Sequence, residues 1–185
     1  CHFKTRNSEY KRSCHESSIR VPTVFTGPGF RGGGQVSELV SLIDLPPTLL
    51  DSAGIDVPEH MQGRSVMPLL SGSSAEWPEE VFVQISEAQT GRAVRTQRWK
   101  YGVDAPGESG LGSDTYVEQY LYDLQSDPYE LNNLVGHESH AGVAEVMSQR
   151  LIRRMREAGE DEPKIERAEV RRSGQRTVSE EERYA

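Results

Sequence analysis

The feature that most constrains the fold is the spacing of short apolar runs in the second half of the chain. Glycines or polar residues separate four runs that are rich in β-branched and aromatic residues. The runs span residues 81–85, 92–96, 99–103 and 119–124. Closely spaced short strands pair most simply with their sequence neighbours, so this pattern predicts an antiparallel sheet of about four strands.

A different period follows the predicted sheet. The apolar side chains that recur there at helical spacing are Val143, Val146, Met147, Leu151 and Met155. They predict one amphipathic helix over residues 142–158, with its apolar face packed across the sheet. The fold class expected for this half of the chain is therefore α+β.

Two elements are expected in the first half of the chain. A β-branched and aromatic run over residues 19–26 predicts a strand, and a Gly-Pro-Gly breaker ends it. Apolar residues at helical spacing predict a helix that begins between Ser41 and Pro46 and ends at Gly54.

Charge is distributed unevenly along the chain. The formal net charge is −8, whereas residues 1–20 carry five basic side chains and two acidic ones. The acidic balance argues against nucleic acid as a partner, and no apolar run is long enough to span a membrane. A local cationic segment on an acidic protein fits an anion site better than a polyanion-binding face. A solvated loop is the alternative.

No complete active-site motif of a common kind is present. Cys1 and Cys14 match neither a zinc-ligand spacing nor a nucleophile motif, and H-E-x-x-H, G-x-S-x-G and P-loop patterns are absent. The segment around Lys11 is the most informative part of the chain for function.

The segment from Lys11 to Pro22 resembles the sulfatase family, a branch of the alkaline phosphatase superfamily. In that family a Lys follows the metal-binding D-H-G or D-N-G motif, and an acidic residue comes five positions later. An Arg-x-Pro then ends the segment just before a strand. Lys11, Glu16, Arg20 and Pro22 have this spacing.

Four further segments resemble family motifs in the same order along the chain. Residues 40–54 are similar to V-S-x-x-D-x-x-P-T-x-L-x-x-A-G, and residues 62–70 to Q-G-R-S-L-x-P-L-L. Residues 92–101 are similar to R-x-V-R-T-x-R-x-K-Y, and residues 121–134 to L-Y-D-L-x-x-D-P-x-E-x-x-N-L. The five matches together cover about residues 1–135.

Other family motifs are absent from the chain: C-x-P-S-R, in which a Cys or Ser becomes formylglycine, the paired-Asp segment and D-H-G. The resemblance therefore implies the C-terminal portion of a sulfatase. It assigns residues 1–74 to the C-terminal part of the catalytic domain, an α/β remnant, and residues 75–159 to a small α+β subdomain. Residues 160–185 are nearly all charged or small, so we expect a flexible tail there.

The resemblance also implies an activity for the parent protein, the hydrolysis of sulfate esters, with sulfated carbohydrate as the expected substrate class. Formylglycine and Ca²⁺, or a similar divalent ion, would come from the missing N-terminal region. We therefore expect no metal ligand in this chain and no turnover by the chain alone. Sulfatases are often exported, but no targeting signal is visible here and the compartment stays open.

The motif match suggests individual roles near the start of the chain. Lys11 corresponds to the family Lys that touches the sulfate, and its compact charge suits that catalytic role. His15, Arg6 and His2 are candidate substrate-binding residues beside Lys11. For His15 the alternative is packing under the loop, and for Arg6 and His2 it is solvation.

Other charged residues of the matched segments are expected to be structural. Glu16 and Arg20 should form an ion pair that holds the Lys11 loop. Four residues alternate on predicted strands, and we expect them to pack on the sheet face or to be solvated: Arg92, Arg95, Trp99 and Lys100.

Two other functions remain open from the sequence. The parent could be a phosphodiesterase or phosphonate hydrolase of the same superfamily, which would share the metal core. The chain could also be a non-catalytic interaction module that docks on a separate catalytic chain or forms a homo-oligomer. In the sulfatase interpretation its partners are the missing N-terminal portion and a sulfate-ester substrate.

Overall fold

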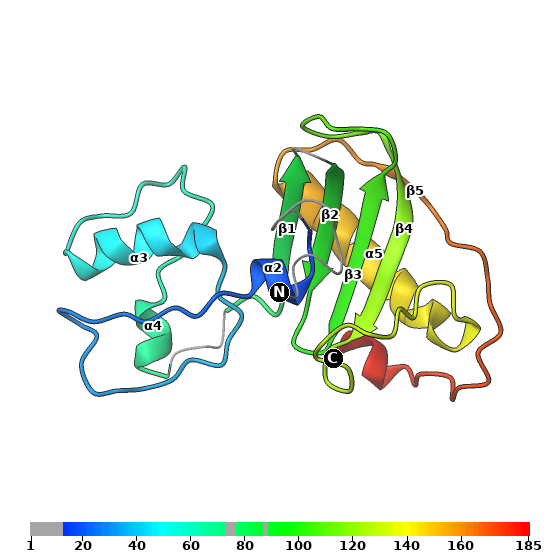
Figure 1. Ribbon diagram of the computed structural model, residues 1–185. Helices are drawn as coiled ribbons and strands as arrows, with labels where there is room; N and C mark the ends of the chain where they lie inside the picture. The colour runs from blue at the N-terminus through cyan, green and yellow to red at the C-terminus, as the bar shows by residue number, and fades with distance from the viewer. Residues whose placement is uncertain (1–12, 73–76, 87–88) are drawn as a thin grey trace. The chain divides into compact units, whose positions relative to one another are not determined.

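The computed structural model describes residues 13–72, 77–86 and 89–185, which form two compact units (Figure 1). The sheet unit contains the described residues up to Val21 together with Phe82–Ala185. The helical unit contains the described part of Pro22–Val81. Residues 13–21 therefore belong to the same unit as the sheet that follows them much later in the sequence, and the later change of unit lies between Val81 and Phe82.

The sheet has five strands in the order β1-β2-β3-β4-β5. They are β1 (Val81–Ser86), β2 (Thr90–Arg95), β3 (Trp99–Ala105), β4 (Thr115–Asp123) and β5 (Lys164–Glu166). β2, β3 and β4 pair antiparallel, as predicted, and the register shifts at Gly102/Val103. The short β5 adds to β4 in the parallel direction and was not predicted.

Helix α5 (Ala141–Glu157) packs on one face of the sheet, within one residue of its predicted bounds. Its fully buried side chains include Val143, Met147 and Leu151, which share a core with Trp99 and Tyr101. Burying each such side chain contributes about 1.5–3 kcal/mol. This helix and the sheet form the predicted α+β subdomain.

The opposite face of the sheet carries a second, smaller apolar cluster. Cys14 packs there with Ala93, Tyr120 and Tyr122. Short helix α2 (Glu16–Ile19) follows Cys14, and Figure 1 shows α2 on the side of the sheet away from α5. A Cβ atom on Gly102 would lie 2.2 Å from the Tyr120 ring, so only glycine lets that ring pack over β3.

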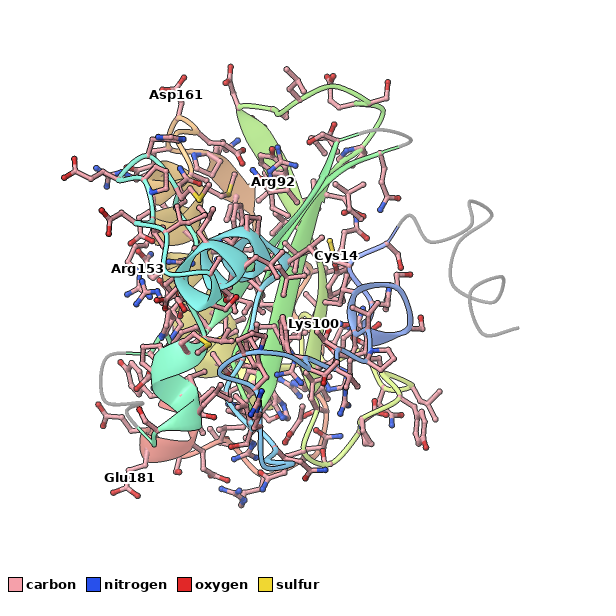
Figure 2. All side chains as sticks on the ribbon, turned by 90° about the vertical axis from the view of Figure 1, so that its left-hand side faces the viewer. Cys14, Arg92, Lys100, Arg153, Asp161 and Glu181 are labelled. Carbon is pink, nitrogen blue, oxygen red and sulfur yellow. The ribbon has the colours of Figure 1, made fainter. Side chains whose placement is uncertain are left out.

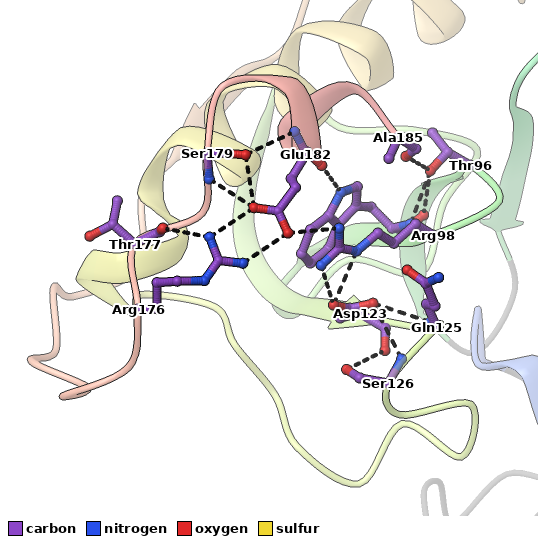
Figure 3. A network of polar contacts seen from close by, with 11 residues as sticks. Thr96, Arg98, Asp123, Gln125, Ser126, Arg176, Thr177, Ser179, Glu182 and Ala185 are labelled. Atoms are coloured by element: carbon purple, nitrogen blue, oxygen red, sulfur yellow. Dashed lines mark hydrogen bonds and ion pairs between the residues drawn. The ribbon is translucent and has the colours of Figure 1, made fainter.

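Residues 160–185 differ from the expected loose tail. They contain β5 and the 3-10 helix η3 (Glu181–Tyr184), and Val178 is buried in the core beneath α5. Glu182 forms ion pairs with Arg98 and Arg176 in the network of Figure 3. The segment is held by single buried side chains and ion pairs, which leave no periodic signal in the sequence.

The helical unit contains the 3-10 helix η1 (Leu42–Asp44), α3 (Leu45–Ser52) and α4 (Met67–Leu70). The predicted helix is confirmed: the Ser41 N–H donates to Asp44 Oδ2 over 2.8 Å, and Gly54 after the helix has φ +71°. Asp44 is buried and also accepts the Arg64 N–H over 3.0 Å, so the segments 40–54 and 62–70 are joined.

The strand predicted over residues 19–26 is wrong. Ile19 ends α2, and residues 20–26 have no regular structure. A β-branched run becomes a strand only where another strand satisfies its backbone groups. Apart from Val81, which begins β1, the described residues of the helical unit contain no strand. Among the described residues, no helix has the length and apolar character needed to cross a membrane.

Candidate functional site

The candidate site residues divide into two groups. Lys11, Arg6 and His2 lie outside the described residues, so their roles stay predictions. His15, Glu16 and Arg20 belong to the segment that directly follows Lys11, and this segment lies on the sheet.

Glu16 begins α2, and its side chain reaches cations on two strands of the sheet. Its Oε1 lies 3.3 Å from Lys100 Nζ on β3 and 3.2 Å from Arg95 Nε on β2. The Lys100 side chain is completely buried, and those of Glu16 and Arg95 are mostly buried. Ion pairs shielded from water in this way are weakened little by salt.

Glu130 joins the same group from the loop after β4. One of its carboxylate oxygens contacts Lys100 Nζ, and Oε2 accepts the backbone N–H of Glu16 over 2.9 Å. The Glu130 side chain is only 3% exposed. We call Glu16, Arg95, Lys100 and Glu130 the Glu16 network. It combines two acidic and two basic side chains, so its formal charges balance.

The loop that carries Glu130 is held by other residues of the matched segment 121–134. Asn133 Oδ1 accepts the N–H groups of Leu121 and Val135, each over 3.0 Å. Asp127 Oδ2 accepts the Asn132 N–H over 2.7 Å. The Asp, Glu and Asn of this motif therefore build one loop, whose buried carboxylate is that of Glu130.

Opposing effects act on the pKa of Glu16. Burial works to raise the pKa, whereas the charges of Lys100 and Arg95 and their hydrogen bonds lower it. The cations prevail, and the pKa of Glu16 lies below its usual value. Glu16 is therefore ionised at neutral pH and acts as a fixed anion that holds α2 on the sheet.

His15 and Cys14 lie beside this network, against aromatic side chains. The His15 ring centre is 5.0 Å from that of Tyr120, and His15 Nε2 lies 3.4 Å from Tyr122 Oη. Burial raises the pKa of Cys14 to about 11, so its thiol stays protonated and is a poor nucleophile. Figure 2 shows Cys14 on one side of the strands and Arg153 of α5 on the other. These contacts fit the packing alternative for His15, and its role toward substrate stays a prediction.

The expected pairing of Glu16 with Arg20 is not what the structure has. The ion pairs of Glu16 are with Arg95 and Lys100, and Arg20 is exposed. The reason is geometric: α2 ends at Ile19, and Arg20 continues in extended backbone while the sheet presents cations to Glu16.

Sequence reasoning missed the importance of Lys100 and Glu130. Both residues stand in matched segments, R-x-V-R-T-x-R-x-K-Y and L-Y-D-L-x-x-D-P-x-E-x-x-N-L. A lysine between two aromatic residues of a predicted strand is a usable signal, because a buried lysine requires an acidic partner. Nothing in the local pattern identifies which acidic residue that partner is.

The described residues do not offer a divalent cation a binding site. Among them, no group of three or more His, Cys, Asp or Glu side chains is arranged to hold a metal ion. Calcium takes six to eight oxygen ligands, so the acidic residues of the Glu16 network do not suit it. Their carboxylates are already engaged by cations and a backbone N–H.

Comparison with known proteins relates residues 9–157 to a family described as N-sulphoglucosamine sulphohydrolase, C-terminal. Arylsulfatase K of Xenopus laevis is 36% identical over 138 residues, which are 69% of this chain and 24% of that protein. Human arylsulfatase K (Homo sapiens) is 37% identical over 135 residues, which are 68% of this chain and 24% of that protein. The chain spans about a quarter of the length of these relatives.

Two solved structures have a similar fold. One is BT4656 in complex with its substrate D-glucosamine-2-N,6-O-disulfate, with a TM-score of 0.55 and 26% identity. The match covers 65% of this chain and 24% of that one. The other is BT1596, a 2-O GAG sulfatase, with a TM-score of 0.53 and 30% identity, covering 64% of this chain and 25% of that one.

Proposed function

Because the chain belongs to the sulfatase family and matches its C-terminal portion, we propose that it forms this portion of an enzyme that hydrolyses sulfate esters. We further propose sulfated carbohydrate as the substrate class. The support for this class is that BT4656 has a sulfated glucosamine as its substrate and that BT1596 is a 2-O GAG sulfatase.

The observation that carries the proposal is the meeting of three matched segments in the Glu16 network. Glu16 comes from segment 11–22, Arg95 and Lys100 from segment 92–101, and Glu130 from segment 121–134. These segments are far apart in the sequence, yet their charged residues pair. Their contact supports the view that the resemblance reflects a shared way of building the region that follows Lys11.

In this proposal Lys11 places a positive charge against the non-bridging oxygens of the sulfate. Cleavage of the ester increases negative charge on those oxygens and on the leaving oxygen, and a cation aimed at them lowers the barrier. Arg6, His2 and His15 would bind anionic groups of the substrate. Formylglycine, made from a Cys or Ser of the enzyme, would supply the nucleophile, and Ca²⁺ or a similar ion would supply further positive charge when bound. We place both in the part of the enzyme outside this chain.

The helical unit exposes apolar side chains that could contact the part of the enzyme outside this chain. Leu42, Ile43, Leu49 and Ile55 are all more than half exposed. We propose that the remainder of the catalytic domain covers these side chains, because apolar surface of this kind commonly marks a contact with another polypeptide.

The activity proposal is tested in the longer enzyme with an aryl sulfate in the presence of Ca²⁺. Replacing Lys11 by Ala should lower kcat/KM about 10²–10³-fold, which is typical for loss of one group that stabilises transition-state charge. Lys4→Ala is the matched control, a lysine of the same cationic segment without a motif match, and should retain activity.

Three outcomes would contradict parts of this proposal. Full activity of Lys11→Ala would remove Lys11 from the sulfate site. Calcium-dependent turnover by the 185-residue chain alone would contradict the placement of the nucleophile outside it. Preference for a phosphonate monoester over a sulfate ester would favour the alternative that the enzyme is a phosphonate hydrolase of the same superfamily.

A further inference from the structure

Lys100 lies in an unusual position for a lysine. It is the second residue of β3, between Trp99 and Tyr101, and its side chain is completely buried. Lysine is almost never fully buried unless it is paired, because its charge loses hydration. Both of its acidic partners, Glu16 and Glu130, come from outside the strands. The buried charge of Lys100 is therefore neutralised only when the segments that carry Glu16 and Glu130 pack on the sheet.

Glu130 has a strained backbone, and this backbone conformation brings its carboxylate to Lys100. Its φ is +57°, the only positive value outside glycine among the described residues, and side chains disfavour that conformation. From this backbone its carboxylate reaches Lys100 Nζ and the Glu16 N–H together. Strain of this kind persists where surrounding contacts enforce it, here those of Asn133 and Asp127.

The two contacts hold α2 at two different points. Lys100 binds the Glu16 side chain, whereas Glu130 binds the Glu16 backbone N–H at the start of the helix. Arg95 also binds the Glu16 side chain, and Cys14 packs on the sheet. The Glu130 contact adds a hold on the backbone, and together with the side-chain contacts it sets the direction of the segment. Lys11 precedes Glu16 by five residues in the sequence, so the direction of this segment governs where the chain leaves toward Lys11.

We propose that Lys100 and Glu130 are positioning residues for the sulfate site, which act by fixing the segment that carries Lys11. This inference rests on the proposed function of Lys11. Neither residue touches the substrate in this account; each acts through Glu16.

Glu118 offers a matched control for Glu130. It is also a buried carboxylate that binds one cation and one backbone N–H, those of Arg167 and Ala168. It accepts the Tyr101 hydroxyl on the α5 side of the sheet and ties down the C-terminal segment instead of α2. Glu118→Gln should therefore cost stability as Glu130→Gln does, without moving the Lys11 segment.

The first measurement is a double-mutant cycle on kcat/KM in the longer enzyme. Lys100→Met should lower kcat/KM about 100-fold, the scale of a misplaced catalytic group. Added to Lys11→Ala, it should lower kcat/KM by less than about threefold more, because both changes remove the same interaction. Lys100→Arg, which keeps the charge, should recover much of the loss.

The second measurement is hydrogen exchange of the peptide over residues 13–21 in the same enzyme, which does not depend on activity. Lys100→Met and Glu130→Gln should each speed exchange of the Glu16 and Arg20 amides, whereas Glu118→Gln should not. Glu130→Gln and Lys100→Arg keep the test decisive if Lys100→Met fails to fold.

Each outcome decides the inference. Faster exchange together with non-additive kinetics supports it. Unchanged exchange overturns the anchoring, and multiplicative losses in the cycle overturn the positioning role, because general destabilisation lowers activity with or without Lys11. Absence of sulfatase turnover in the unaltered enzyme would instead refute the proposed function, and the exchange data would still show whether the network holds the segment.

Discussion

Single residues on the two faces of the sheet show how burial and charge are balanced. Arg92 and Lys100 are both almost fully buried, and each has an acidic partner, Glu160 at 2.8 Å and Glu16 at 3.3 Å. Asp104 behaves differently from these partners, because burial raises its pKa to about 6. A carboxyl group with a raised pKa weakens the folded state once it must ionise.

We predict that Asp104→Asn stabilises the sheet unit at pH 7. The pKa of Asp104 is higher when folded than when unfolded, so ionisation costs stability increasingly as the pH rises from about 4 to 6. Removing the charge should gain about 1–3 kcal/mol at pH 7 and nothing near pH 3.5. Urea unfolding at the two pH values measures this, with the exposed Asp114→Asn as control. Equal effects at both pH values would contradict the assignment.

At the scale of elements, the C-terminal segment completes the core that α5 begins. Trp99 Nε1 donates to the Glu182 carbonyl over 2.7 Å, and Arg98 lies over the Trp99 ring at 4.5 Å. Val178 is 5% exposed within the same core. A segment of mostly charged residues thus contributes to the sheet unit through a few specific contacts (Figure 3).

Deleting residues 176–185 should destabilise the sheet unit by about 2–4 kcal/mol. The deletion removes the buried Val178 side chain from the core and leaves the Trp99 N–H without its acceptor. Each of these changes lowers the free energy of unfolding by about 1–3 kcal/mol. Chemical denaturation followed by tryptophan fluorescence measures the change. Arg153→Ala on the exposed face of α5 is the control and should have little effect. An unchanged midpoint for the truncated chain would show that the segment does not contribute to the core.

Across the whole molecule, the two units differ in how far their apolar side chains are buried. The sheet unit has two clusters of buried apolar side chains, one on each face of the sheet, although it also exposes Leu111 and Leu131. The helical unit leaves several of its own exposed, with Leu42 74% exposed. The exposed residues of the helical unit are those that we propose another polypeptide segment covers.

We expect the 185-residue chain to bind the N-terminal portion of the enzyme when the two are supplied separately. Leu49→Lys should weaken this binding about tenfold or more, because burial of one leucine contributes about 1.5–3 kcal/mol. Light scattering and titration measure the complex, and Leu131→Lys, which changes an exposed leucine of the sheet unit, is the control. A monodisperse monomer that ignores the N-terminal portion would contradict the expectation, and self-association would favour a homo-oligomer.

The local elements and the family can be inferred from the amino-acid sequence alone. Strands β2 and β3, helix α5 and the ends of α3 follow from periodicity and capping, which depend on residues a few positions apart. The ordered motifs were sufficient to indicate the C-terminal portion of a sulfatase, a result that the comparisons confirm. These signals are local or are preserved as short patterns, so they can be read without coordinates.

The pairing of charged residues, in contrast, depends on how the whole chain folds. Glu130 lies 114 residues from Glu16 in the sequence, and no local pattern pairs them. The predicted strand over residues 19–26 failed and the unpredicted β5 formed for one reason: a strand exists where a neighbouring strand accepts its backbone hydrogen bonds. Partner choice over long distances depends on how the chain folds back on itself, and here that folding places Lys100 beneath the segment that follows Lys11.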